Sequence, residues 1–390
     1  MEQQITFETL KTLIQVEDID LVSMQEIENY FLNDESLRKY IPDGIYQIDP
    51  RTGDRIVYNS SRARRPHDNI PLDTPKTEQS RATDCVICQG KTTKVLDIKE
   101  LSHGYTFINK NLYPIFYPLQ HLHPDIDHPY RRQDSEGLPS YGFHFLQWTS
   151  SYHNRDWHNM PLADREIVME RLAILEKKLL TSPLSNSQTS NHQNKTIPPQ
   201  GYVSIIKNYG YLVGGSLIHG HQQIAFSNVM PRRVIDHIQF EALRDEKFSS
   251  YLLKNNPVQL TIKDYGPAVL LVPYFMRRPY DMFLVIKDPS KQYLYQLNEE
   301  ELSATAEGWH DGILLMLLIM RQIQREPAYN IITHNGEGAG IYFEFLPYTQ
   351  EIGGMEHLGL YLCQANPFSA AKQLKKILND QDAKQQKSNS

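Results

Sequence analysis

The sequence predicts an α+β fold made of two similar halves, in which a mostly antiparallel sheet is flanked by helices. Residues 163–180 carry apolar side chains at a period of about 3.6, which is typical of a helix with one buried face, and residues 303–324 also predict a long helix. Short apolar runs, bounded by polar segments, flank both stretches and indicate β-strands. Because this order of strands, helix and strands occurs twice in 390 residues, we expect a duplicated unit.

The elements can be assigned in order along the chain. Residues 1–40 predict short acidic helices. The first half then predicts strands at 46–58, 105–108, 141–148 and 201–206. The second half predicts a helix at 236–254, strands at 269–272, 282–286, 329–332, 341–345 and 358–362, and a last helix at 369–378.

Four parts follow from this assignment. They are a helical N-terminal extension (1–40), an N-terminal half (41–233), a C-terminal half (234–380) and a disordered polar tail (381–390).

Composition excludes several classes of protein. The hydrophobic share of 40% is enough for a sizeable core, and the net charge of −6 argues against a general nucleic-acid-binding surface. Three cysteines are too few for a disulfide framework and fit a reducing compartment. The polar N-terminus does not resemble a signal peptide, and the longest apolar run, 313–320, is too short to span a bilayer. We therefore expect a soluble cytoplasmic protein without nucleic-acid or membrane partners.

The most informative segment is Asn208-Tyr-Gly-Tyr-Leu-Val-Gly-Gly-Ser-Leu-Ile-His-Gly-His-Gln-Gln223. In an extended segment, alternate side chains share a face, so His219, His221 and Gln223 are expected to project to the same side. The glycines before them let the backbone approach a bound group closely, and successive amides of such a turn form an anion-binding nest. The segment predicts a phosphate cradle beside a row of imidazoles, which suits nucleophilic attack on phosphorus.

The spacing N-x-G-x3-G-x-S-x2-H-x-H-x-Q resembles the active-site motif of the galactose-1-phosphate uridylyltransferases, the transferase branch of the histidine triad superfamily. All fixed positions are filled, namely Asn208, Gly210, Gly214, Ser216, His219, His221 and Gln223. The resemblance implies two histidine-triad-like halves and a catalytic set of His221, Gln223 and Ser216. It also implies that Asn208, Gly214 and Gly215 bind substrate. Triad hydrolases have a third histidine at the position of Gln223, and glutamine cannot replace it in proton transfer.

Cys85-Val-Ile-Cys88 alone is compatible with a zinc knuckle, a redox pair or coincidence. Residues 142–153 resemble the family segment G-x-H-x5-S-x2-H, in which the last histidine is a metal ligand. The resemblance therefore implies a structural zinc (Zn) site formed by Cys85, Cys88, His153 and His219. We expect a structural role for His144, and a solvated loop rather than a metal site for His121, His123 and His128.

Further positions resemble the substrate-binding residues of the family. Arg62 and Arg65 fill the places of two arginines near the nucleotide phosphates, and Asn111 lies in a segment similar to the nucleoside pocket. Glu356 matches a glutamate that contacts hexose hydroxyls. The loop carrying Glu356 lacks a lysine found in the best-known enzymes, so the sugar stays open. A further metal site near His334 and Glu344 also stays open, because residues 341–344 lack the second histidine pair of many family members.

The resemblance implies a nucleotidyltransferase that works through a covalent nucleotidyl-histidine. The expected type is a UDP-glucose–hexose-1-phosphate uridylyltransferase of galactose metabolism, with nucleotide sugar and sugar 1-phosphate as substrates and a homodimer as the assembly. An alternative is an ADP-sugar or dinucleoside tetraphosphate phosphorylase, in which phosphate or a nucleotide is the acceptor. An alternative of another class is a non-catalytic, zinc-containing nucleotide sensor.

Overall fold

The structure is a computed structural model that describes residues 3–59, 61–62, 85–118, 137–181 and 201–388, with side chains up to residue 384. The chain divides into two compact units. The first unit contains Met1–Asn154, Arg171–Ile205 and His221–Asp236. The second unit contains Arg155–Glu170, Ile206–Gly220 and His237–Ser390.

The sheet of the first unit is antiparallel. Its strand order is β3 (Val95–Glu100), β4 (Tyr105–Lys110), β6 (Gly142–Trp148) and β8 (His221–Ser227). Every residue of β6 is buried, including the polar side chains of His144 and Gln147. A separate three-stranded sheet has the order β2 (Arg55–Tyr58), β1 (Ile45–Ile48) and β5 (Leu138–Pro139).

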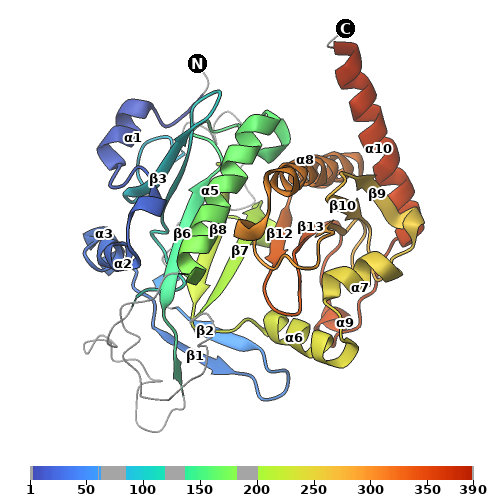
Figure 1. The fold of residues 1–390 in the computed structure, drawn as a ribbon, viewed down its shortest axis with the longest axis horizontal. Coiled ribbons are helices and arrows are strands. Elements are labelled where there is room, and N and C mark those ends of the chain that lie inside the picture. The colour runs from blue at the N-terminus through green and yellow to red at the C-terminus, as the bar shows by residue number, and fades with distance from the viewer. Residues whose placement is uncertain (1–2, 60, 63–84, 119–136, 182–200, 389–390) are drawn as a thin grey trace, which may run out of the picture. The chain divides into compact units, whose positions relative to one another are not determined.

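The N-terminal helices are α1 (Phe7–Leu13), the 3-10 helix η1 (Ile19–Leu21), α2 (Met24–Leu32) and α3 (Glu35–Arg38), shown in blue in Figure 1. Two buried charged contacts attach them to the sheet of the first unit. Arg171 pairs with Asp97 of β3 and also with Asp18, 2.6 Å away. Lys110 of β4 pairs with Asp34 and donates to the carbonyl oxygen of Tyr30 at 2.8 Å. Residues 3–40 therefore contain short helices, as predicted, and pack into the first unit.

The sheet of the second unit is antiparallel as well. Its order is β7 (Tyr202–Tyr209), β12 (Tyr329–His334), β13 (Tyr342–Pro347), β11 (Met282–Ile286), β10 (Ala268–Leu271) and β9 (Thr261–Asp264). Residues 206–209 of β7 pair with β12. Both β10 and β11 are buried along their whole length and form the apolar centre of this unit.

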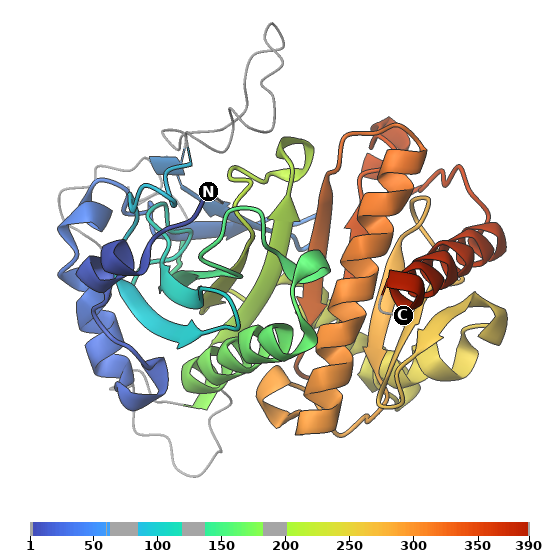
Figure 2. The ribbon, with the colours of Figure 1, turned by 90° about the horizontal axis from the view of Figure 1, so that it is seen from above.

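Helix α8 (Glu299–Gln322) packs on β10, β11 and β13, and Figure 2 shows it in orange along these strands. Its start is defined by Asn298, whose side chain accepts a hydrogen bond from the Glu301 amide, and by three glutamates in the first turn. Helix α10 (Pro367–Ser388) packs beside α8. The α+β class and the antiparallel sheets are thus confirmed.

The other α-helices of the described residues are α5 (Leu162–Thr181), α6 (Arg232–Arg244), α7 (Phe248–Asn255) and α9 (Gly354–His357). The predicted helix at 236–254 is in fact α6 and α7, because Asp245 takes a positive φ of 55° that interrupts the helix. The predicted strand at 358–362 is wrong: after α9 this segment is irregular and Leu358 is 77% exposed. Helix α10 continues past its predicted end through residues 381–388, whose Gln, Lys, Asp and Ala side chains tolerate a helix.

Among the described residues, no helix has both the length and the apolar character needed to cross a membrane.

Candidate active site

The segment between β7 and β8 is a tight, glycine-rich turn. Gly210 follows β7 with φ of 88°, and Gly214 follows the 3-10 helix η5 (Tyr211–Val213) with φ of 84°. Residues with a side chain rarely adopt such positive values of φ. A Cβ on Gly210 would also lie 2.7 Å from the carbonyl oxygen of Pro327. The backbone therefore requires glycine at position 210.

An anion-binding nest at Gly214 and Gly215 would need free amide donors. In the structure the Gly214 amide donates to the Tyr211 carbonyl at 3.2 Å, and the Gly215 amide donates to the Gly210 carbonyl at 2.9 Å. Both amides are used inside the turn. Ser216, whose side chain is half-buried, is the next group along the chain that can donate a hydrogen bond to a phosphate.

His221 is the first residue of β8 and lies opposite Trp148 of β6. The two ring centroids are 4.9 Å apart, so the indole supports one side of the imidazole. Gln223 follows two positions later, opposite Leu146, and alternation along the strand places it on the same face as His221. Both side chains are more than nine-tenths buried. The strand thus fixes the imidazole and the amide as a pair.

Gln223 also belongs to a buried polar group in the first unit. Its Oε1 lies 3.2 Å from Nε2 of His144, and Nδ2 of Asn111 lies 3.3 Å from the same nitrogen. The structure thereby brings together Asn111 and Gln223, which the sequence assigned to separate roles. His144 has a hydrogen-bonding position, as expected from the sequence.

Asn208 of β7 is oriented by a residue that the sequence reading missed. Its Oδ1 accepts a hydrogen bond from Nδ2 of Asn330 at 2.7 Å, and the same Nδ2 lies 3.1 Å from the Val213 carbonyl oxygen. Asn330 of β12 is paired with Asn208 across the strands. Asn330 therefore joins the end of β7 to the turn.

A buried ion pair lies against the glycine between the two motif histidines. The Nζ of Lys207 is 2.7 Å from Oδ2 of Asp156, and the two side chains are 1% and 7% exposed. A Cβ on Gly220 would lie 2.6 Å from Cγ of Asp156. Burial opposes ionisation of Asp156, but the charge of Lys207 outweighs it and lowers the pKa of this carboxyl. The sequence reading missed both residues; the available signal was a lysine at a buried position of an alternating strand.

Cys85, Cys88, His153 and His219 come together as the resemblance implies. One ligand-type atom from each residue lies within 4.8 Å of the others, and Cys88 Sγ is 3.7 Å from His153 Nδ1. Hydrogen bonding to Cys85, burial and the neighbouring sulfur charge raise the pKa of the Cys88 thiol. A cation between the sulfurs would reverse this effect. Two sulfurs and two imidazoles match the donor set of a tetrahedral metal site.

The predicted arginines are only partly described. Arg62 donates from Nη1 to the carbonyl oxygen of Tyr113, which follows Asn111 by two residues. Arg65 lies outside the described residues, as do His121, His123 and His128. The structure thus places Arg62 next to the segment that carries Asn111.

Glu356 holds its own loop together. Its Oε2 accepts from the Gly353 amide at 2.9 Å, and its Oε1 accepts from the Leu362 amide at 3.2 Å. Hydrogen bonds from its own backbone amide and from those of Gly353 and Leu362 lower the pKa of the carboxyl. In this conformation both oxygens are already used, so a sugar hydroxyl would share them with the backbone.

His334 and Glu344 form a pair, with His334 Nε2 at 3.1 Å from Glu344 Oε2. Nearby, Nε2 of His237 is 2.7 Å from the hydroxyl of Tyr342. Within the described part of the chain, the group with Cys85 is the only one with three or more convergent metal-type ligands. The His334–Glu344 pair therefore offers fewer metal-type ligands than the group with Cys85.

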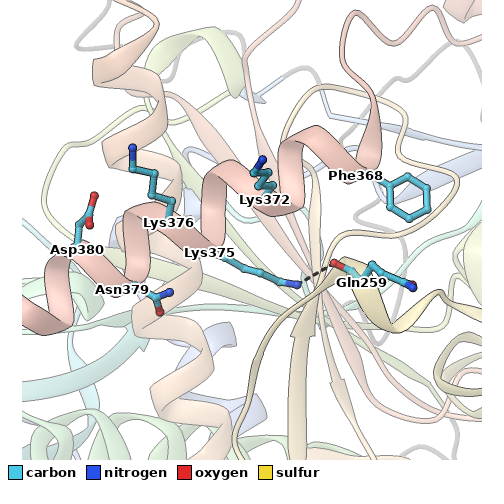
Figure 3. A pocket seen from close by; sticks show the side chains of 7 residues that line it. All are labelled: Gln259, Phe368, Lys372, Lys375, Lys376, Asn379 and Asp380. Atoms are coloured by element: carbon cyan, nitrogen blue, oxygen red, sulfur yellow. Dashed lines mark hydrogen bonds between the residues drawn. The ribbon is translucent and has the colours of Figure 1, made fainter.

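One cavity of about 460 Å³ lies along α10 and is lined mainly by lysines and amides. Figure 3 shows Lys375 reaching across it to the carbonyl oxygen of Gln259, at 2.8 Å. Lys372 and Lys376 are exposed, and no residue of the histidine motif lines this cavity. It is a surface feature apart from the residues described above.

Comparisons with known proteins agree with these observations. No protein-family model matches the sequence. An ADP-glucose phosphorylase of Arabidopsis thaliana is 21% identical over 348 residues, which are 84% of this chain and 92% of that protein.

Solved structures show the same fold. A uridylyltransferase structure has a TM-score of 0.62 at 16% identity and covers 86% of this chain and 99% of its own. An ADP-glucose phosphorylase from Arabidopsis thaliana with bound ADP-glucose has a TM-score of 0.56 at 15% identity, with 85% and 98% covered. The chain therefore shares its fold with a uridylyltransferase and an ADP-glucose phosphorylase, in agreement with the resemblance seen in its histidine motif.

Proposed function

We propose that this chain is a nucleotidyltransferase in which His221 carries the nucleotidyl group. The observation that carries the proposal is the start of β8, where His221 and Gln223 share one face of a buried strand. A strand holds both groups at a fixed separation, which is what attack on a phosphorus atom requires. Ser216 lies in the turn before this strand, and Asn208 lies near the end of β7.

The reaction has two steps. An imidazole nitrogen of neutral His221 forms a bond to the α-phosphorus of a nucleoside diphosphate sugar, and the bond to the sugar 1-phosphate oxygen breaks. An oxygen of a second phosphate group then attacks the phosphorus, and the electron pair of the P–N bond returns to the imidazole. The amide N–H groups of Gln223 stabilise the negative charge of the phosphoryl oxygens.

Gln223 favours ionised phosphates as acceptors. Its amide neither gains nor loses a proton appreciably near neutral pH, so it cannot act as the acid or base that a water nucleophile requires. A phosphate dianion needs no such help, because it is already ionised. The acceptor is therefore a sugar 1-phosphate, inorganic phosphate or a nucleotide.

Three classes of donor remain as candidates, and one of them is a dinucleoside tetraphosphate. The family resemblance favours a UDP-hexose and hexose 1-phosphate, as in galactose metabolism. The sequence similarity to an ADP-glucose phosphorylase favours an ADP-sugar with phosphate as acceptor. These reactions use the same covalent step. The phosphorylase alternative therefore differs in the nucleobase of the donor and in the acceptor, and the mechanism is the same.

We propose zinc as the metal held by Cys85, Cys88, His153 and His219. When bound, such an ion supplies a fixed point of attachment for His219, two residues before His221. Its role in this proposal is structural, and neither step of the reaction passes through it. The resemblance also leads us to propose a homodimer, which light scattering on the purified chain would test.

Isotope exchange would test the proposed function. Labelled glucose 1-phosphate should enter UDP-glucose or ADP-glucose without any second acceptor, because the covalent step is reversible. In a third reaction, labelled ATP should enter a dinucleoside tetraphosphate in the same way. Exchange with a uridine donor supports a uridylyltransferase, whereas exchange with an adenine donor supports a phosphorylase. Absence of exchange with all three donors, in a folded chain that binds nucleotide, would support the sensor reading instead.

A further inference from the structure

His144 is a fully buried imidazole on β6 whose two ring nitrogens have different neighbours. The amide of Ile115 donates to Nδ1 at 3.0 Å. On the other side, Nε2 faces Oε1 of Gln223 at 3.2 Å. All three residues belong to the first unit.

The Ile115 contact decides which nitrogen carries the proton. A backbone amide is always a donor, so Nδ1 of His144 must be an acceptor. In a neutral imidazole the hydrogen is then on Nε2, and Nε2–H donates to Gln223. In the opposite tautomer, Nδ1–H of His144 would face the Ile115 amide, so two donors would meet where the buried imidazole has no solvent to accept from them.

The contact with Asn111 is longer than the Ile115 contact and does not change the assignment. The Oδ1 of Asn111 accepts from the Tyr113 amide at 2.9 Å, which leaves Nδ2 as the atom 3.3 Å from His144 Nε2. Because Nδ2 and Nε2–H are both donors in this arrangement, this contact is no hydrogen bond. The carbonyl oxygen of the Gln223 amide is the acceptor that matches Nε2–H.

We propose that His144 is a positioning residue that fixes which end of the Gln223 amide faces substrate. With Oε1 held by His144, the NH₂ group is the branch left to contact a phosphoryl oxygen. Gln223 then presents hydrogen-bond donors to the transferred phosphoryl group. Its acceptor oxygen is occupied by His144 and does not orient a water molecule for attack. His144 thus sets the preference for phosphate acceptors over hydrolysis, and this role rests on the proposed function of His221.

Two substitutions test the contributions of Nδ1 and Nε2 of His144 separately. The amide group of Asn lies near the position of Nδ1, and that of Gln reaches the position of Nε2. His144→Gln should therefore keep a donor for Gln223 and retain nucleotidylation to within about threefold. His144→Asn should lower the rate of adduct formation by roughly tenfold to a hundredfold, with little change in donor KM. The fraction of adduct lost to water should rise as well.

A double-variant comparison distinguishes positioning from general damage. In a Gln223→Ala background, His144→Asn should have almost no further effect, because the amide that it orients is gone. The proposal would be overturned if His144→Asn lowered the rate of adduct formation equally in both backgrounds. It would also be overturned if His144→Asn formed adduct at the wild-type rate and lost the wild-type fraction of it to water.

The tautomer can be measured without any activity. In ¹⁵N-histidine-labelled protein, His144 should show a protonated Nε2 and an unprotonated Nδ1. The reverse pattern overturns the inference whatever the enzyme does. If the predicted tautomer is found but no adduct forms in wild-type protein, the proposed function fails while the orientation of Gln223 stands.

Discussion

Gly220 separates the two motif histidines, and the Lys207–Asp156 ion pair is buried against it. The sequence predicted His219, His221 and Gln223 because their pattern is local, a simple alternation within five residues. It could not predict the ion pair, because Asp156 and Lys207 are 51 residues apart and the buried strand position of Lys207 does not identify its partner. Pairing across such a distance depends on the fold.

Gly220→Ala should impair catalysis more than it impairs folding. The new Cβ would meet Asp156 Cγ at 2.6 Å, so the backbone beside His221 must shift. We expect the rate of adduct formation to fall roughly tenfold to a hundredfold. Stopped-flow mass measurement of the adduct would check this. Gly354→Ala is the matched control, because a Cβ there meets nothing within 4 Å; equal rates in the two variants would contradict the account.

Asp156→Asn should destabilise the chain by about 3–5 kcal/mol, because it leaves a buried ammonium without its carboxylate. The lowered pKa of Asp156 gives a pH dependence as well. Its stabilising contribution is complete above the ordinary value of 3.8 and is lost as pH falls through the lowered pKa. Urea denaturation at a series of acidic pH values would measure both effects. Adding Lys207→Met should restore much of the stability of Asp156→Asn; no recovery would speak against the pair.

At the scale of elements, the N-terminal helices support the strand that precedes Asn111. Lys110, at the end of β4, is 1% exposed and pairs with Asp34 between α2 and α3. The sequence predicted these helices from their spacing, and it predicted α5 and α8 within a few residues, because long amphipathic patterns are clear. It missed β3, where Asp97 and Lys99 hide the strand pattern. It also assigned a strand to 358–362 from apolar residues that remain exposed.

Asp34→Ala should therefore destabilise the chain by about 3–5 kcal/mol through the unpaired Lys110. Glu35→Ala, one residue away and exposed, should change stability by no more than about 0.5 kcal/mol. Chemical denaturation of both variants would make the comparison. If the two variants were equally stable, the helices would be a loosely attached extension after all.

For the whole molecule, the metal group predicts a link between metal content and activity. Purified protein should contain about one zinc per chain, and Cys88→Ser should lose it. We expect this variant to melt at a lower temperature and to form adduct more slowly, because His219 loses its attachment two residues before His221. Elemental analysis and calorimetry would test this. Cys363→Ser should keep the metal, since Cys363 lies outside the group; loss of metal there too would refute the assignment.

The α+β class was predictable from the order of elements, and the group of four metal-type ligands was predictable from the motifs, whereas the duplication of the two halves and the roles of the site residues stay predictions. Substrate choice was not predictable, because Glu356 hydrogen-bonds to its own loop and Arg65 is outside the described residues. Specificity depends on groups brought together only in a substrate complex, which no local pattern encodes.

The most direct test of the central claim is to locate the covalent adduct. Wild-type protein would be incubated with UDP-glucose and with ADP-glucose, kept at mildly basic pH, digested, and the peptide containing residues 219–223 fragmented in a mass spectrometer. The account predicts one nucleotidyl group on His221, and none in His221→Gly. A group on His219 or on another residue, or one that persists in His221→Gly, would contradict it.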